Sequence, residues 1–126
     1  MIGVLVDVEK AVVMALDSLP VSVGTRVPDP RPASFVRVGV VSGGPLATAV
    51  EAPVVLVECW AVGSVAAFDL ARDAWALLTS LEKTFVGDAW VLSVQASRPV
   101  NLPDPLTASD RYQFPATVRV ALNPAP

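Results

Sequence analysis

Proline decides where regular structure can form in this chain. The 126 residues include twelve prolines. Proline has no amide hydrogen to donate and a fixed φ, which keep it out of helix interiors and central strands. Three prolines within 27–32 therefore predict an extended connector, and Pro20 ends the helix before it. The segment 99–110, with three more prolines, and the segment 43–53 are predicted to be loops.

Size and composition predict one ordered domain spanning residues 1–126. Hydrophobic residues make up 53% of the chain and charged residues 17%. This apolar content can offset the entropy of the chain and excludes disorder. The net charge of −3 argues against a nucleic-acid binder that works by neutralising phosphates.

Two segments place apolar residues at helical spacing. The first runs from Asp7 to Leu19, with Asp7 as the N-cap. The second opens at Ser64, a candidate N-cap, and ends near Lys83. Its expected core stripe consists of Phe68, Ala71, Trp75, Leu78 and Leu81, flanked by Ala67, Leu70 and Ala74.

Alternating side chains predict strands at 21–26, 34–41, 54–62, 88–97 and 111–122. Within 54–62, placing Glu58 outside sends four side chains inward: Val55, Val57, Cys59 and Ala61. Within 88–97, Trp90 falls on the core face. Pro115 lies inside the last strand, where the missing amide donor predicts an edge or a bulge.

The order of these elements predicts the fold class. A helix, two or three strands, a second helix and two further strands indicate an α+β domain. Such a chain forms a mainly antiparallel sheet of four to five strands with two helices packed on one face.

Residues that usually carry catalysis or bind metals are scarce. The chain has no histidine and one cysteine, so it lacks the usual general base, the commonest metal ligand and an internal disulfide. Cys59 is interpreted as a buried structural thiol, Asp69 and Asp73 as a solvated helix face, and 43–45 as a turn. We therefore predict no catalytic residue, no metal site and no cofactor, and we expect a protein that is not an enzyme.

The sequence also predicts where the protein works. The N-terminus has no basic region and reaches Asp7 after six residues, unlike a secretory signal. The longest apolar run, within 54–62, is interrupted by Glu58 and is far shorter than the ~20 residues of a membrane span. We expect a cytosolic protein, or one assembled in a cytosol, without a membrane partner.

The outer face of the strand 54–62 is too apolar to face water. It carries Val54, Leu56 and Trp60 around Glu58, so another chain is expected to cover it. An outward tryptophan usually marks such a contact, although a register shift of one residue would turn Trp60 into the core. Candidates for the polar rim of this contact are Arg37, Arg111 and Arg119.

Several stretches, spread over nearly the whole chain, carry a resemblance to a known family. They are the helix at Asp7–Val13, the strand at Phe35–Gly39, the turn at Gly43–Pro45, the strand end at Glu58–Ala61, the helix at Ala67–Arg72, and the C-terminal hairpin at Pro99–Pro105, Arg111–Phe114 and Thr117–Val120. Together they resemble the tail terminator (minor tail) proteins of long-tailed phages, particularly phages of actinobacteria.

The resemblance implies a hexameric ring that caps the tail tube, stops its polymerisation and docks the head connector, with DNA passing through the ring without specific binding. The partners would be further copies of the chain, the tail tube protein and the connector or stopper protein, in the head-proximal tail of a virion assembled in the host cytoplasm. The expected subunit contacts are Val54, Leu56, Glu58, Trp60, Arg37, Arg111 and Arg119. The expected partner-ring loops hold Gly43, Gly44, Pro45 and Leu46, and Leu102, Pro103, Asp104 and Pro105.

Two alternatives remain at this stage. One is a different neck or head-tail connector component, which shares small size and ring assembly. The other is a small α+β enzyme or ligand-binding domain with a pocket between sheet and helices. That second alternative requires polar groups on the inward faces, which here are almost wholly apolar.

Overall fold

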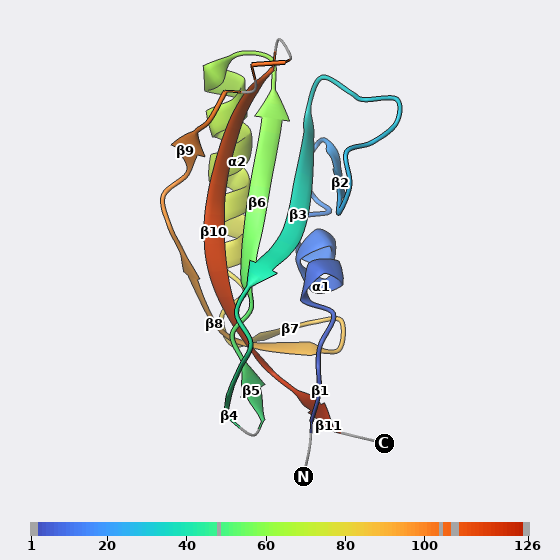
Figure 1. Ribbon diagram of the computed structural model, residues 1–126, viewed down its shortest axis with the longest axis vertical. Coiled ribbons are helices and arrows are strands. Elements are labelled where there is room, and N and C mark those ends of the chain that lie inside the picture. Colours follow the sequence, from blue (N-terminus) through green and yellow to red (C-terminus); the bar gives the residue numbers. More distant parts are fainter. Residues whose placement is uncertain (1–2, 48, 104, 107–108, 125–126) are drawn as a thin grey trace.

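Two helices pack on one face of a curled, mostly antiparallel sheet (Figure 1). The structure is a computed structural model and describes residues 3–47, 49–103, 105–106 and 109–124. The helices are α1 (Val8–Ala15) and α2 (Ser64–Thr79). The strand pair β2–β3 is parallel, so the sheet is mixed. The predicted α+β class with two helices is confirmed.

The sheet has more strands than the four to five predicted. In the part of the chain that is described, nine strands join one sheet, in which β6 lies between β3 and β10. β1 and β11 form a separate two-stranded ribbon. The strands are β1 (Gly3–Val4), β2 (Ser22–Gly24), β3 (Phe35–Ser42), β4 (Pro45–Ala47), β5 (Val50–Glu51), β6 (Val54–Ala61), β7 (Thr84–Val86), β8 (Ala89–Ala96), β9 (Val100–Asn101), β10 (Asp110–Ala121) and β11 (Asn123–Pro124).

The helix ends differ from their predicted positions. Asp7 caps α1 as expected, because its Oδ1 accepts the Lys10 amide at 3.1 Å. The N-cap of α2 is Gly63, with no side-chain hydrogen bond, so the expected cap at Ser64 is wrong. α2 also ends at Thr79 rather than near Lys83. The Thr79 hydroxyl donates to the carbonyl of Trp75 at 2.8 Å, and Lys83 has a φ of 59°, which no right-handed helix accommodates.

The core is one apolar layer between the helices and the sheet. α1 contributes Val8 and Val12, its C-cap Leu16 adds a third side chain, and β6 contributes the inward side chains predicted for it, including Val57. Phe68 and Trp75, expected in the core stripe of α2, are half-buried at its border. The buried stripe keeps Ala71 and Leu78 of the expected set and adds the three residues expected to flank it, Ala67, Leu70 and Ala74. Its small side chains let α2 approach the sheet closely.

A β-bulge explains why Trp90 is not in the core. In the pairing of β8 with β10, Ser93 lies opposite Arg119 and Val91 lies opposite Val120, so Leu92 is the extra residue. The bulge shifts the alternation, and Val91 takes the buried position. The prediction for Trp90 is therefore wrong, since its half-buried ring packs on exposed Phe85, with centroids 4.7 Å apart.

Pro115 lies within the long strand β10 and pairs with Leu56 of β6 on one side only, so β10 has a local edge there, as one of the two predictions has it, and no bulge. Its carbonyl accepts the amide of Ser97, one residue after β8 ends, at 3.1 Å. The nitrogen and carbonyl of a strand residue point to the same side. The missing donor of Pro115 therefore faces the interval between β8 and β9, where no ladder bond requires it.

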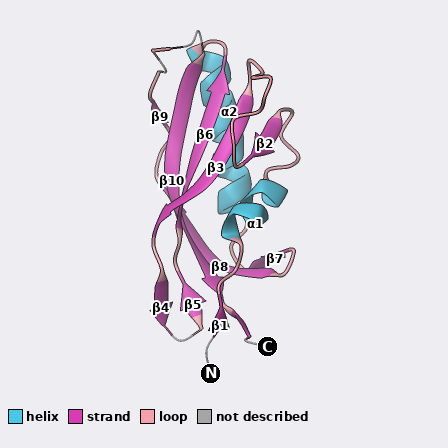
Figure 2. Ribbon diagram, turned by 45° about the vertical axis from the view of Figure 1, so that its right-hand side comes forward, coloured by secondary structure: helices cyan, strands magenta, loops and turns pink. Residues whose placement is uncertain are grey.

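The two segments predicted as loops lie at opposite ends of the sheet. The segment 43–53 contains the hairpin β4–β5, so the loop prediction is wrong there, and β5 pairs with the end of β10 at Val120 and Ala121. The segment 99–110 contains β9, which pairs near the start of β10, at Tyr112 and Gln113. Figure 2 shows the hairpin and β9 far apart along the sheet.

We expect Phe114→Ala to lower the free energy of unfolding by about 3–5 kcal/mol, since it leaves a cavity in the core. Phe114 is fully buried, whereas Phe85 is 68% exposed. The matched variant Phe85→Ala should cost about 1 kcal/mol or less. Urea unfolding followed by tryptophan fluorescence measures both. Equal losses would show that the core is misassigned.

Candidate assembly surface

The sheet face that carries no helix is formed by the outward side chains of β3, β6 and β10. β6 directs Val54, Leu56, Glu58 and Trp60 to this face, as the alternation predicts. Val54 and Leu56 are half-buried, whereas Glu58 and Trp60 are buried. We call this surface the open face.

Trp60 is covered by its own chain. Only 3% of the residue is exposed, and its ring stacks on Phe35 with centroids 4.6 Å apart. The guanidinium groups of Arg31, Arg37 and Arg111 lie over the Trp60 ring at 5.5, 5.9 and 5.5 Å. Trp60 does point to the outer face, but the expectation that another chain must cover it is wrong.

Glu58 joins the strands on either side of β6. Its Oε1 accepts from Nε of Arg37 at 2.8 Å and lies 2.6 Å from Nη2. Its Oε2 lies 3.6 Å from Nη1 of Arg111. Cross-strand neighbours of opposite charge stabilise a sheet, and the Glu58 side chain is only 7% exposed. We call the group of Phe35, Arg31, Arg37, Glu58, Trp60 and Arg111 the arginine cluster.

Sequence reasoning missed two members of the arginine cluster. Arg31 lies in the proline-rich connector, whose path across the sheet no local pattern shows. Phe35 alternates with Val36 and so shares a face with Arg37, but the pattern of one strand does not show that its ring stacks on Trp60 of another. Arg119 was predicted with the others but lies apart, in a groove of about 370 Å³ with Glu82 and Thr117.

The expected partner-ring residues divide between the two ends of the sheet. Gly43, Gly44, Pro45 and Leu46 belong to the hairpin end, and Leu46 is 58% exposed. Gly43 has a φ of 99°, and a Cβ there would collide with the backbone of Ala52, so glycine is required. At the other end, Leu102, Pro103 and Pro105 are exposed, while Asp104 lies outside the described residues.

A groove of about 380 Å³ runs beside the hairpin and is lined in part by Leu5, Val40 and Glu51. Glu51 is buried, and this burial raises the pKa of its carboxyl, although a hydrogen bond from the Val6 backbone opposes the shift. Glu9 lines the same groove, and its Oε2 accepts the amide of Val40 at 2.8 Å. The side chain thereby blocks part of the β3 edge from pairing with other strands.

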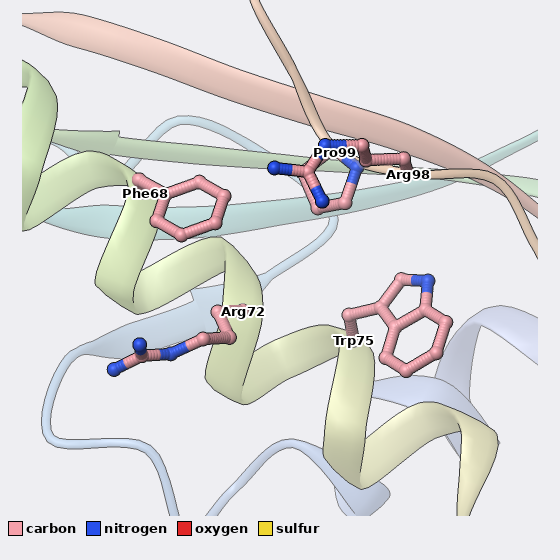
Figure 3. A pocket seen from close by; sticks show the side chains of 5 residues that line it. All are labelled: Phe68, Arg72, Trp75, Arg98 and Pro99. Carbon is pink, nitrogen blue, oxygen red and sulfur yellow. The ribbon is translucent and has the colours of Figure 1, made fainter.

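A second groove, of about 300 Å³, lies between α2 and the connection from β8 to β9 (Figure 3). Phe68 and Trp75 line it from α2, while Arg98 and Pro99 line it from the connection. Nε1 of Trp75 donates to the carbonyl of Ser97 at 3.2 Å, which holds the connection against the helix. No carboxylate or nucleophile lines this groove among the residues described.

Cys59 is buried on the inner face of β6, as expected. Burial, with a smaller effect from the charge of Glu58, raises the pKa of its thiol to about 12, so it stays protonated and unreactive at neutral pH.

In the described ranges, the acidic and cysteine side chains form no group of three that could hold a metal ion. No helix within them is long and apolar enough to cross a membrane.

Comparison with known proteins places the fold. No family model matches this sequence, and no curated protein matches it. A chain in the solved structure described as the virion of a native gene transfer agent (GTA) particle superposes with a TM-score of 0.68 at 17% identity. The match covers 90% of this chain and 93% of that one. This protein has the fold of a virion chain.

We expect Glu58→Ala to lower the free energy of unfolding by about 1–3 kcal/mol, since it leaves two partly buried guanidinium groups without their carboxylate. The control is Asp69→Ala. Asp69 pairs with Arg72 at 3.3 Å on the surface of α2, where both side chains are more than half exposed. That change should cost about 0.5 kcal/mol or less. Urea unfolding compares the two, and a smaller loss for Glu58→Ala would contradict the assignment.

Glu51→Gln should be as stable as the wild type near about pH 4 and more stable at about pH 7. Burial raises the pKa of Glu51 in the folded state, so the protonated form favours folding. That contribution is lost as the pH rises through the folded-state pKa. Glutamine stays neutral throughout. Thermal unfolding across this range tests the prediction, with exposed Glu82→Gln as control, and a wild type that is more stable than Glu51→Gln at neutral pH would refute it.

Proposed function

We propose that this protein is a structural component of a phage-like virion, and that it acts as the tail terminator. In this role, copies close into a ring, most simply a hexamer, that caps the tail tube, stops its polymerisation and offers a docking surface to the head connector. The observation that carries the proposal is the superposition of 90% of the chain on a chain of the gene transfer agent virion. The sequence resemblance to tail terminators supplies the specific role.

The two ends of the sheet support a position between two partners. The hairpin β4–β5 presents exposed Leu46 at one end, and the segment around Leu102 and Pro103 is exposed at the other. A ring stacked between a tube and a connector needs a different contact surface on each axial side. Protruding loops and hairpins commonly supply such contacts. We assign the two ends to the tail tube protein and the connector protein, in either order.

The open face supports contact between copies. Leu56 and Val54 remain half-buried beside exposed Pro115, because the arginine cluster covers only the Trp60 end of β6. A ring forms when one patch meets a different patch on the neighbour, and closure then limits growth. We assign Val54 and Leu56 to this contact. Trp60 and Glu58 would not touch the second copy themselves but would hold in place the guanidinium groups that cover them.

A different neck or connector component would share the fold and the ring. The two functions separate in an elongation experiment with purified tail tube protein. Substoichiometric addition of this protein should stop tube growth and leave rings at tube ends, seen by negative-stain electron microscopy. Unchanged elongation, with rings that bind only connector protein, would overturn the terminator role in favour of the connector component.

Leu56→Asp and Leu46→Asp should give opposite phenotypes. Leu56→Asp places a charge in the proposed subunit contact, so the ring should dissociate while the monomer keeps a cooperative unfolding transition. Leu46→Asp changes the exposed hairpin, so the ring mass should stay while binding to the tube or connector weakens. Native mass spectrometry measures the ring, and pull-down with each partner measures docking. Loss of the monomer fold in Leu56→Asp would contradict its placement at a contact.

A further inference from the structure

The groove of about 380 Å³ beside the hairpin β4–β5 has acidic residues in its lining and, among the residues described, no basic ones. Its carboxylates are those of Asp7, Glu9 and Glu51, and the rest of the lining is mostly apolar. Lys10 follows Glu9 in the chain but lines a different groove, together with Asp88. We call the acidic groove the hairpin groove.

Glu51 is the residue of this lining that most needs a partner. It is only 5% exposed, and the partner that the described residues supply is a backbone hydrogen bond from Val6. One amide donor cannot satisfy both oxygens of a carboxylate. Glutamates are almost never fully buried unless they are paired. The hairpin groove therefore lacks a cationic group beside Glu51.

We propose that the hairpin groove receives a lysine or arginine side chain of the protein that docks at the hairpin end, and that this cation pairs with Glu51. The inference rests on the proposed function, which assigns the hairpin end to an axial partner. A long cationic side chain matches both parts of the lining. Its methylene stem can lie along Leu5, Val40 and Pro45, while its charged end reaches the carboxylate.

Glu9 supplies a second carboxylate that is held in place. Its Oε2 accepts the amide of Val40 at 2.8 Å, whereas no hydrogen bond or ion pair joins Oε1 to a described residue. Oε1 can therefore accept from an incoming cationic side chain. A metal ion matches the groove less well, because the described acidic side chains form no group of three that could hold one.

The position of the hairpin groove favours an axial partner over a second copy. Pro45 lines the groove, and the next residue of the hairpin, Leu46, is 58% exposed. The residues assigned to contact between copies, Val54 and Leu56, are not part of the lining. Complementary charges across an interface select the partner and fix its register, so the acidic groove selects a partner with a basic side chain beside its contact to Leu46.

Glu51→Gln tests the contact, because it keeps the size of the side chain and removes its charge. The variant should be more stable than the wild type at about pH 7. Its binding to the partner at the hairpin end should nevertheless weaken at least about tenfold, since the incoming cation loses its carboxylate. Glu82→Gln removes the same charge away from the hairpin groove and should bind like the wild type. Isothermal titration calorimetry with purified tail tube protein, and separately with purified connector protein, measures both variants.

Glu9→Gln gives a second test that does not depend on the Glu51 variant. The amide oxygen of glutamine can still accept from Val40, so the fold should persist while one charge of the groove is lost. We expect its affinity for the same partner to fall at least about threefold. If Glu51→Gln folds, its wild-type affinity for both proteins would overturn the inference. If it does not fold, an unchanged affinity of Glu9→Gln would do so.

The outcomes separate this inference from the proposed function. If the wild-type ring stops tube growth and Glu51→Gln docks as tightly as the wild type, the inference is wrong while the terminator role stands. If Glu51→Gln lowers the ring mass in native mass spectrometry instead of weakening docking, the cation belongs to a second copy and the inference is wrong. If the wild-type protein binds neither tube nor connector protein and does not alter tube growth, both the inference and the proposed function fail.

Discussion

The register of β6 is the constraint on which the rest of the structure depends. β6 pairs with β3 on one side and with β10 on the other along nearly its whole length. It therefore cannot change its register with one neighbour without breaking its pairing with the other. A slip of one residue would carry Glu58 into the apolar layer and Val57 out of it. Because burying an unpaired carboxylate is costly, the sequence of this strand fixes which face packs on the helices and which one holds charge.

The charged face shapes how such a subunit can assemble. Trp60 and Glu58 are already satisfied in part within the chain, through Phe35, Arg37 and Arg111. The apolar area left for a partner is therefore modest, around Leu56. Contacts built on partly exposed ion pairs are selective but weak and sensitive to salt. If the proposed ring is closed by such contacts, its assembly depends on a surface that holds several copies together.

The long, regular elements could be predicted from the sequence, and the irregular ones could not. Strands 34–41, 54–62 and 111–122 and the cap at Asp7 agree with β3, β6, β10 and α1 because each pattern repeats over enough residues to fix a face. The hairpin β4–β5 has strands too short for any period. The bulge at Leu92 inverts the alternation of β8, and the approach of Arg31 to Trp60 depends on the path of a connector that has no periodicity.

The same distinction explains how a fold can be shared at 17% identity. Packing requires apolar side chains of suitable volume at alternating positions, and many residue combinations meet that requirement. The arginine cluster is a more specific feature, since a guanidinium stacked on an aromatic ring and paired with a carboxylate has no isosteric substitute. The sheet and its core can therefore stay the same in two proteins while the charged groups on the open face differ.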